Sequence, residues 1–162
     1  MQRDILLLGE PALYESSSEV TLEQVPMIDD WVEDLRDTLL AFRKRYHAGR
    51  AIAAPQIGIK KRVVYRNLNG IETIFINPRL LFGDDDMFEL WDDCMSFPNL
   101  LVRVMRHARC TVIYRDRDWT EHTVRLEGDM SELLQHECDH LDGILATMRA
   151  IDDKSFKSSF RS

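Results

Sequence analysis

The sequence predicts an α+β fold in a single domain covering residues 1–162. A helical apolar repeat near the N-terminus and a histidine-containing helix near the C-terminus flank several short, turn-separated apolar segments typical of antiparallel strands. A chain of 162 residues is long enough to bury one hydrophobic core and short for two domains. The order helix, strands, helix therefore favours the α+β class.

The composition excludes several classes of protein. With 44% hydrophobic and 30% charged residues the chain is not disordered, and three cysteines are too few, and odd in number, for a disulfide scaffold. The net charge of −7 argues against nucleic-acid binding. No apolar run reaches the roughly 20 residues of a membrane span, and the apolar N-terminal stretch is too short for a signal peptide. We therefore expect a cytoplasmic protein with no DNA or membrane partner.

The first predicted element is an amphipathic helix over 27–46. Its apolar residues recur at i, i+3, i+4 and i+7, with acidic and basic residues between them. The following segment, 49–58, is made largely of small residues. Backbone or ligand can approach closely there.

Antiparallel strands are expected next. The predicted strands are 62–66, 71–76, 100–104, 109–114 and 123–126. Asn69-Gly70 between the first two is a strong hairpin signal, and Asn77-Pro78 marks a break in the chain's extended structure. A second helix is predicted from Asp129 to about Gly143, and the tail beyond Asp152 as a short helix or a frayed end.

The strongest chemical signal is the HExxH sequence of residues 136–140 on the second helix. A spacing of four places His136 and His140 on one face, so that both imidazoles can reach one cation, with Glu137 beside them. The alternative is a solvated helix face that carries two histidines. Catalytic sites of this kind normally use a third protein ligand.

Several residues are candidates for that third ligand. They are Cys94, Cys110, His107, His122 and assorted acids. Cys110 lies in the middle of an apolar strand and is better explained as a small buried hydrophobe. Cys138 points to another helix face than the histidines. Cys94 lies in a polar, turn-prone segment where a thiolate could be presented, although a free loop cysteine is the alternative.

Three motifs, in order, resemble those of peptide deformylases. Residues 49–56 correspond to the family's Gly-x-Gly-Leu-Ala-Ala-x-Gln, 92–96 to Glu-Gly-Cys-Leu-Ser, and 135–143 to Gln-His-Glu-x-Asp-His-Leu-x-Gly. The resemblance extends to residues 76–78 and to the strand around Arg106, so it covers most of the chain. It implies antiparallel sheets packed around a central HExxH helix.

The resemblance also implies the metal site and the reaction. The implied metal ligands are Cys94, His136 and His140. Glu137 is implied as the general acid/base, and Gln56 with the backbone N–H of Met95 as the oxyanion donors. Fe(II) is the expected physiological ion, while zinc, nickel or cobalt also suit a thiolate and two imidazoles. The expected reaction removes the formyl group from N-terminal formyl-methionine of new peptides and releases formate.

The residues assigned to substrate binding are Gly49, Arg50, Ala51, Asp93, Arg106, Glu132 and Leu133. Several of them depart from the family pattern. Asp92 and Asp93 replace the Glu-Gly that precedes the cysteine in the family motif, and Arg50 occupies a position that is more often apolar in the family. Asp93 faces either the metal or the solvent. Glu132 faces either the pocket or, as we favour, the backbone as the third helical residue of a capping box started by Asp129.

These departures leave the substrate open. If Arg50 and Glu132 both face the pocket, formyl-methionine fits poorly and a formylated polar or charged amine is the better substrate. A metal-binding homologue without activity is a further alternative, against which the intact Gln56 and Glu137 count. A generic HExxH peptidase is the least favoured alternative, because the sequence after His140 does not contain the third metal ligand of that pattern. The basic runs 43–45 and 60–62 allow a weak ribosome contact, but a solvated surface explains them more simply.

Overall fold

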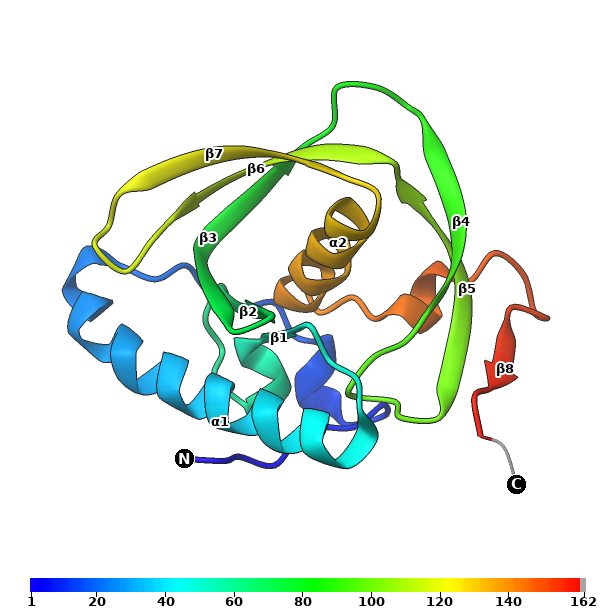
Figure 1. Cartoon of the computed structure of the whole chain (residues 1–162), viewed down its shortest axis with the longest axis horizontal. Coiled ribbons are helices and arrows are strands. Elements are labelled where there is room, and N and C mark those ends of the chain that lie inside the picture. Colours follow the sequence, from blue (N-terminus) through cyan, green and yellow to red (C-terminus); the bar gives the residue numbers. More distant parts are fainter. Residues whose placement is uncertain (161–162) are drawn as a thin grey trace.

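The computed structural model describes residues 1–160 and places two antiparallel sheets around a central helix. In Figure 1 helix α2 (Asp129–Leu141) lies in the middle of the molecule, with strands arching over it and beside it and helix α1 below. The predicted α+β class and the packing around the HExxH helix are confirmed. No helix within residues 1–160 is both long and apolar enough to cross a membrane.

Helix α1 (Ile28–Tyr46) agrees with the predicted amphipathic helix. Its Val32, Leu35 and Leu39 are fully buried and pack against the core that the first strands also line. The helix ends at His47, whose left-handed φ of 55° turns the chain toward the small-residue segment. The helix therefore packs against strand β1 (Ala51–Ala53), which follows this segment.

The larger sheet has the order β1-β2-β3-β6-β7. Its strands are β1 (Ala51–Ala53), β2 (Val63–Leu68), β3 (Ile71–Leu81), β6 (Arg109–Arg115) and β7 (Glu121–Glu127). The predicted hairpin is confirmed: Leu68 pairs with Ile71, and Asn69 and Gly70 between them have φ of 53° and 83°.

The predicted break at Asn77-Pro78 takes the form of an irregularity within β3, which continues beyond it to Leu81. The register of β3 against β6 shifts between Ile76 and Arg79, and Asn77 has a φ of 51°. The extra residues form a bulge, which accommodates a proline inside a strand. The Asn77 side chain accepts from the backbone N–H of Val20 and donates to its carbonyl at 2.8 and 2.9 Å.

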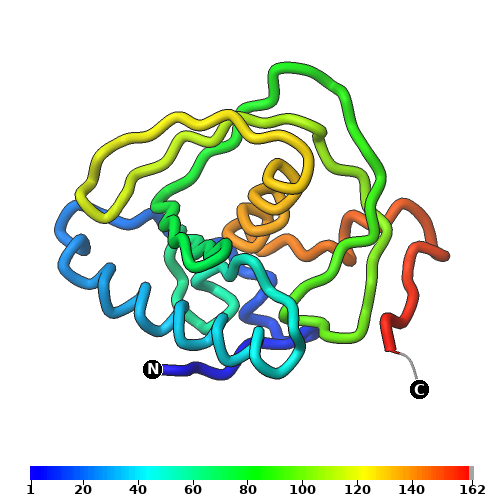
Figure 2. The backbone as a smooth tube through the Cα atoms, viewed as in Figure 1, coloured from blue at the N-terminus to red at the C-terminus, as the bar shows by residue number. Residues whose placement is uncertain are grey.

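The smaller sheet has the order β4-β5-β8. Its strands are β4 (Met87–Asp92), β5 (Leu100–His107) and β8 (Phe156–Ser158). The prediction of a helix or frayed end beyond Asp152 is wrong, since Leu100 pairs with Ser158 in an antiparallel ladder. Figure 2 shows this last segment running beside β5.

Helix α2 is buried from Ser131 to Leu141, including its polar residues. Hydrogen bonds offset the cost of burying these polar groups. The Gln135 side chain, for example, accepts from the backbone N–H of His107 and donates to its carbonyl, each at 2.9 Å. Four short 3-10 helices complete the described structure, at Pro11–Tyr14, Leu22–Met27, Ala54–Ile57 and Ala146–Arg149.

The capping box that we favoured at the start of α2 is wrong. The N-cap residue is Gly128, with a φ of 56°, and no side chain caps the helix there. Asp129 is already the first helical residue, and the Glu132 side chain turns away into the protein.

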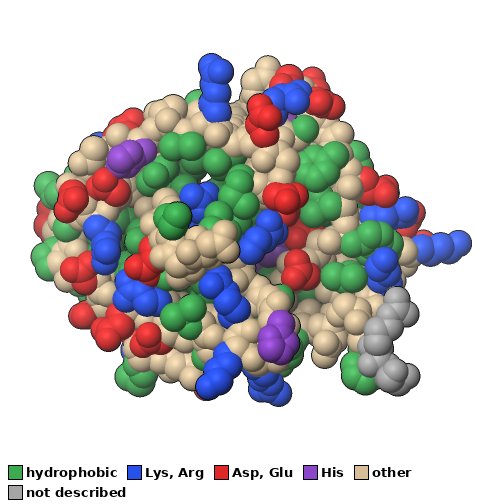
Figure 3. All heavy atoms as spheres, in the orientation of Figure 1, with side chains coloured by type: hydrophobic (Ala, Val, Ile, Leu, Met, Phe, Trp, Pro, Cys, Tyr) green, Lys and Arg blue, Asp and Glu red, His purple; other side chains and the backbone are tan. Residues whose placement is uncertain are grey.

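Acidic and basic side chains are interspersed over the face shown in Figure 3. No continuous cationic surface dominates that face, in agreement with the acidic net charge.

Candidate active site

Cys94, His136 and His140 converge in the interior. Cys94 follows the end of β4, and both histidines lie one turn apart on α2. One potential ligand atom from each lies within 4.8 Å of the others, and the Cys94 Sγ is 3.3 Å from the His140 Nε2. All three residues are less than 10% exposed. A thiolate and two imidazoles at these separations suit a tetrahedral divalent cation with one open position.

The surroundings of the histidines support metal binding. Nδ1 of His136 is 2.8 Å from the Oδ2 of Asp92, an arrangement that leaves the other ring nitrogen to face a cation. Burial opposes ionisation of Asp92, but His136 and Arg106 more than offset this and lower its pKa to about 2. Burial also lowers the pKa of His140, which favours the neutral imidazole that a metal requires.

Arg106 and Asp139 extend this network behind the histidines. The Arg106 guanidinium donates to Asp92 at 3.1 Å and to Asp139 at 2.6 Å, and Arg149 donates to Asp139 at 2.6 Å. Arg106 is 2% exposed and does not line the cavity at Cys94. The structure therefore does not bring Arg106 to this cavity with the other predicted substrate-binding residues, and its guanidinium holds two buried carboxylates.

Glu137 is 3% exposed and adjoins the ligand cluster. Its Oε1 is buried and has no hydrogen-bond partner within residues 1–160. Burial raises the pKa of Glu137 to about 7. A carboxyl group with this pKa can both accept and return a proton near neutral pH.

Gln56 and Met95, the predicted oxyanion donors, lie next to Cys94. The Gln56 Oε1 accepts from the backbone N–H of Ala53 at 2.9 Å, so its Nε2 faces the site and donates to the Ser96 Oγ at 3.0 Å. The same Nε2 is 3.7 Å from the Cys94 Sγ. Met95 is 6% exposed.

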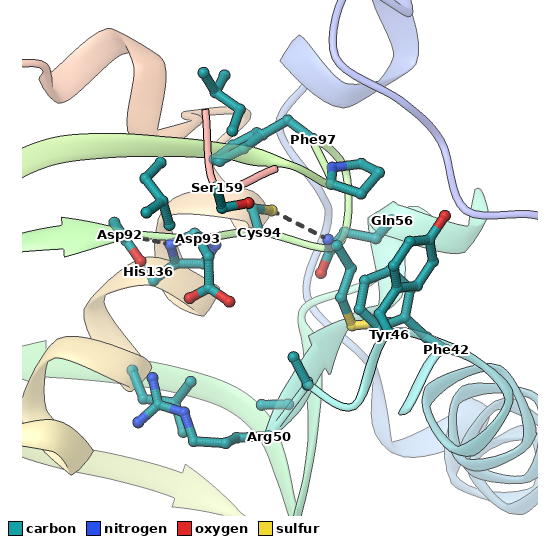
Figure 4. Close-up of a pocket in the computed structure, with 18 of the residues that line it drawn as sticks. Phe42, Tyr46, Arg50, Gln56, Asp92, Asp93, Cys94, Phe97, His136 and Ser159 are labelled. Atoms are coloured by element: carbon teal, nitrogen blue, oxygen red, sulfur yellow. Dashed lines mark hydrogen bonds and ion pairs between the residues drawn. The ribbon is translucent and has the colours of Figure 1, made fainter. Parts of the chain in front are cut away.

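A cavity of about 220 Å³ opens beside this cluster. Its lining includes Gln56, Cys94, Met95, His136 and Glu137. Figure 4 shows Gln56, Cys94 and His136 around the cavity, with Phe42 and Tyr46 of α1 along one side. The predicted catalytic and metal-binding residues therefore share one cavity, apart from His140, which is buried behind it.

The structure brings most of the predicted substrate-binding residues to the same cavity. Those that line it are Gly49, Arg50, Ala51, Asp93, Glu132 and Leu133. Asp93 lines the cavity and is at the same time exposed to solvent. The Glu132 Oε1 accepts from the Arg50 Nη2 at 2.6 Å, which replaces the cap contact we favoured.

The other candidates for a third ligand lie elsewhere. Cys110 and Cys138 are both part of the apolar core between α2 and the larger sheet. His107 stacks on Phe82, with 3.9 Å between the ring centroids. His122 is 2.6 Å from Asp116.

Sequence reasoning missed the supporting roles of Asp92, Ser96 and Asp139. The available signal was the position of a carboxylate two residues before Cys94 and another directly before His140. Neither spacing reveals that Arg106, from the neighbouring strand β5, joins the two.

Comparison with known proteins identifies the family. The model of the polypeptide deformylase family matches residues 2–156. The chain belongs to the polypeptide deformylase family. It is a metalloenzyme of the hydrolase class that removes the N-formyl group from nascent peptides, so the predicted family, enzyme class and reaction are confirmed.

Relatives match nearly the whole chain. Peptide deformylase 1 of Prochlorococcus marinus is 36% identical over 95% of this chain and 83% of its own length. Peptide deformylase 2 of Ralstonia nicotianae is 34% identical over 96% of this chain and 91% of its own. The crystal structure of the Thermotoga maritima peptide deformylase has a TM-score of 0.84 at 28% identity, covering 94% of this chain and 99% of its own.

Proposed function

We propose that Cys94, His136 and His140 hold one divalent cation, with Fe(II) as the physiological ion. The convergence of their three ligand atoms within 4.8 Å is the observation that carries this proposal. Zinc, nickel or cobalt are compatible with the same donor set in the purified protein. When bound, the cation supplies Lewis acidity, which polarises the formyl carbonyl and favours hydroxide over water at neutral pH.

Glu137 acts as the general acid/base. Its carboxylate takes a proton from the attacking water as the water oxygen bonds to the formyl carbon. It then returns that proton to the peptide nitrogen while the C–N bond breaks. The products are formate and a free amino terminus. The pKa of about 7 suits both steps.

Gln56 and the backbone N–H of Met95 stabilise the tetrahedral oxyanion. The Gln56 Nε2 donates to the Ser96 hydroxyl at 3.0 Å and lies 3.7 Å from the Cys94 Sγ, so the amide is held next to the proposed metal ligand, where the oxyanion would form. Neutral donors placed beforehand in this way stabilise developing negative charge without reorganisation.

The test uses protein purified anaerobically with Fe(II), because thiolate–iron sites are easily oxidised. We expect release of formate from formyl-Met-Ala-Ser, and loss of bound iron in Cys94→Ala. Absence of formate from protein with a full iron complement would contradict the proposal and favour the inactive homologue. Unchanged iron content in Cys94→Ala would contradict the ligand set.

We also propose a cytoplasmic location, which the three free and buried cysteines support. We further propose a weak contact with the ribosome through Lys44 and Arg45, which are exposed at the end of α1. Most of the other cations of the two basic runs are engaged within the fold; Arg62, for example, donates to the Leu141 carbonyl at 3.0 Å. Co-sedimentation of Lys44→Glu/Arg45→Glu with ribosomes tests this contact, and undiminished binding would contradict it.

A further inference from the structure

One wall of the active-site cavity is charged. Arg50 directly precedes β1, Asp93 directly follows β4, and Glu132 lies one turn before His136 on α2. All three line the cavity that also holds Cys94 and Glu137. A substrate that reaches Cys94 and Glu137 shares its cavity with these three side chains.

Glu132 and Arg50 form the fixed part of the wall. Glu132 is 4% exposed, and its Oε1 accepts from the Arg50 Nη2 at 2.6 Å. The Glu132 Oε2 is buried without a partner among the described residues. Arg50 itself is half-buried, and its remaining N–H groups make no hydrogen bond within residues 1–160. The pair thus presents guanidinium donors to the cavity.

Asp93 supplies the opposite hydrogen-bonding character. Its carboxylate accepts no hydrogen bond from any side chain or backbone group in the described part of the chain, and the residue is exposed. Figure 4 shows it projecting toward the side of the cavity where Arg50 lies. Its charge also acts on the Arg50 guanidinium. Donors and an acceptor without partners therefore face the same space.

We propose that Arg50, Asp93 and Glu132 form a polar subsite that accepts a first substrate side chain ending in a carboxamide, in addition to methionine. This inference rests on the proposed function. A carboxamide carries one carbonyl acceptor for Arg50 and two N–H donors for Asp93, and it is neutral. Glutamine is the natural example, because it is unbranched and close to methionine in length.

Other side chains match the wall less well. An acidic side chain would meet the charges of Asp93 and Glu132. A cationic side chain could pair with Asp93, but it would be repelled by the Arg50 guanidinium and would leave the Arg50 donors without an acceptor. An apolar side chain strips water from the Arg50 donors and the Asp93 acceptor and replaces none of their hydrogen bonds. The wall therefore raises the relative rate for a carboxamide.

The experiment compares formyl-Gln-Ala-Ser with formyl-Met-Ala-Ser on the iron-loaded enzyme. In Arg50→Met/Glu132→Leu both charges of the pair are removed together, so neither partner is left without its counter-charge. We expect the ratio of kcat/KM for the glutamine to the methionine peptide to fall roughly tenfold in this double variant. The ratio of dissociation constants of the products Gln-Ala-Ser and Met-Ala-Ser, measured by calorimetry, shifts in the same direction.

Controls separate this inference from the proposed function. Arg109→Met/Asp84→Leu removes a surface ion pair outside the cavity and leaves the ratio unchanged. Asp93→Ala, at an exposed position that does not endanger folding, lowers the ratio at least threefold. The subsite is overturned if the ratio of kcat/KM for the glutamine to the methionine peptide in the double variant stays within threefold of wild type. If the double variant does not fold, an unchanged ratio in Asp93→Ala overturns it. Lack of turnover of both peptides would instead contradict the proposed function.

Discussion

Asp92 and His136 are joined by a 2.8 Å contact between the Asp92 Oδ2 and the His136 Nδ1. The contact links the last residue of β4 to the central helix and fixes which ring nitrogen is free for a cation. Both residues are almost completely buried, so water does not compete for this interaction.

Replacing Asp92 by Asn is therefore expected to weaken metal binding. The amide keeps the shape but loses the charge that orients the ring and raises its basicity. We expect the dissociation constant for zinc, measured by competition with a chromophoric chelator, to rise about 10- to 100-fold. Asp93→Asn is the matched control, because it removes a neighbouring charge that makes no contact with His136 within residues 1–160. In this control we expect the dissociation constant for zinc to stay within threefold of wild type. Equal effects of the two variants would contradict an orienting role.

Glu137→Gln is expected to remove the proton transfer and leave the metal site intact. The amide cannot accept a proton from water, so kcat for formyl-Met-Ala-Ser should fall by about 10² to 10⁴. Metal content, measured by atomic absorption, stays at the wild-type value. Glu127→Gln, at the exposed end of β7, serves as the control and retains full activity. Turnover within tenfold of wild type would show that another group carries the proton.

The elements with a strong local pattern were predictable from the sequence. Helix α1 has an unbroken apolar repeat, and the hairpin after β2 depends on Asn69 and Gly70, which adopt positive φ readily. Strand β4 was missed because its residues alternate between half-exposed and exposed, which gives no apolar alternation to detect. Strand β8 is exposed throughout and exists because β5 offers it an edge.

The site residues also differ in how far the sequence alone predicts their roles. The ligands and the base follow from short motifs, since HExxH fixes its own geometry on a helix. The roles of Arg106 and Glu132 depend on partners that are 14 to 82 positions away, at Asp92 and Arg50, and only the folded chain brings these together. A local cap at Glu132 was the simpler expectation. The ion pair prevails because the fold places the Arg50 guanidinium 2.6 Å from the Glu132 carboxylate.

Gly143, just beyond α2, packs directly on the N-terminal segment. A Cβ at this position would lie 2.6 Å from the backbone carbon and oxygen of Tyr14, and its φ of 72° is in the left-handed region. We expect Gly143→Ala to lower the free energy of unfolding by about 3 kcal/mol or more, because backbone atoms must move. Gly58 has a similar φ of 84° but open space around it, so Gly58→Ala should cost only about 1 kcal/mol. Urea unfolding of both variants tests this, and equal losses would rule out the steric contribution.

Glu72 connects the larger sheet to α1 and makes stability depend on pH. It accepts from the Arg36 Nη2 at 3.1 Å and also from the Tyr65 hydroxyl. The hydrogen bond from Arg36 lowers the pKa of Glu72 below its ordinary value of 4.5. Because the folded state holds the carboxylate ionised, its contribution is fully present above pH 4.5 and is lost as the pH falls through the lowered pKa.

We therefore expect Glu72→Gln to be less stable than wild type by about 1 kcal/mol or less at pH 7, since the pair is partly exposed. The difference should shrink below pH 4.5 and vanish once wild-type Glu72 is protonated. Glu33→Gln, on the exposed face of α1, is the control for the loss of a surface carboxylate and should change the free energy of unfolding at pH 7 by no more than about 0.5 kcal/mol. Urea unfolding between about pH 3 and 7 measures both variants against wild type. A constant difference for Glu72→Gln across this range would mean that packing at Tyr65, rather than the charge of Glu72, stabilises this contact.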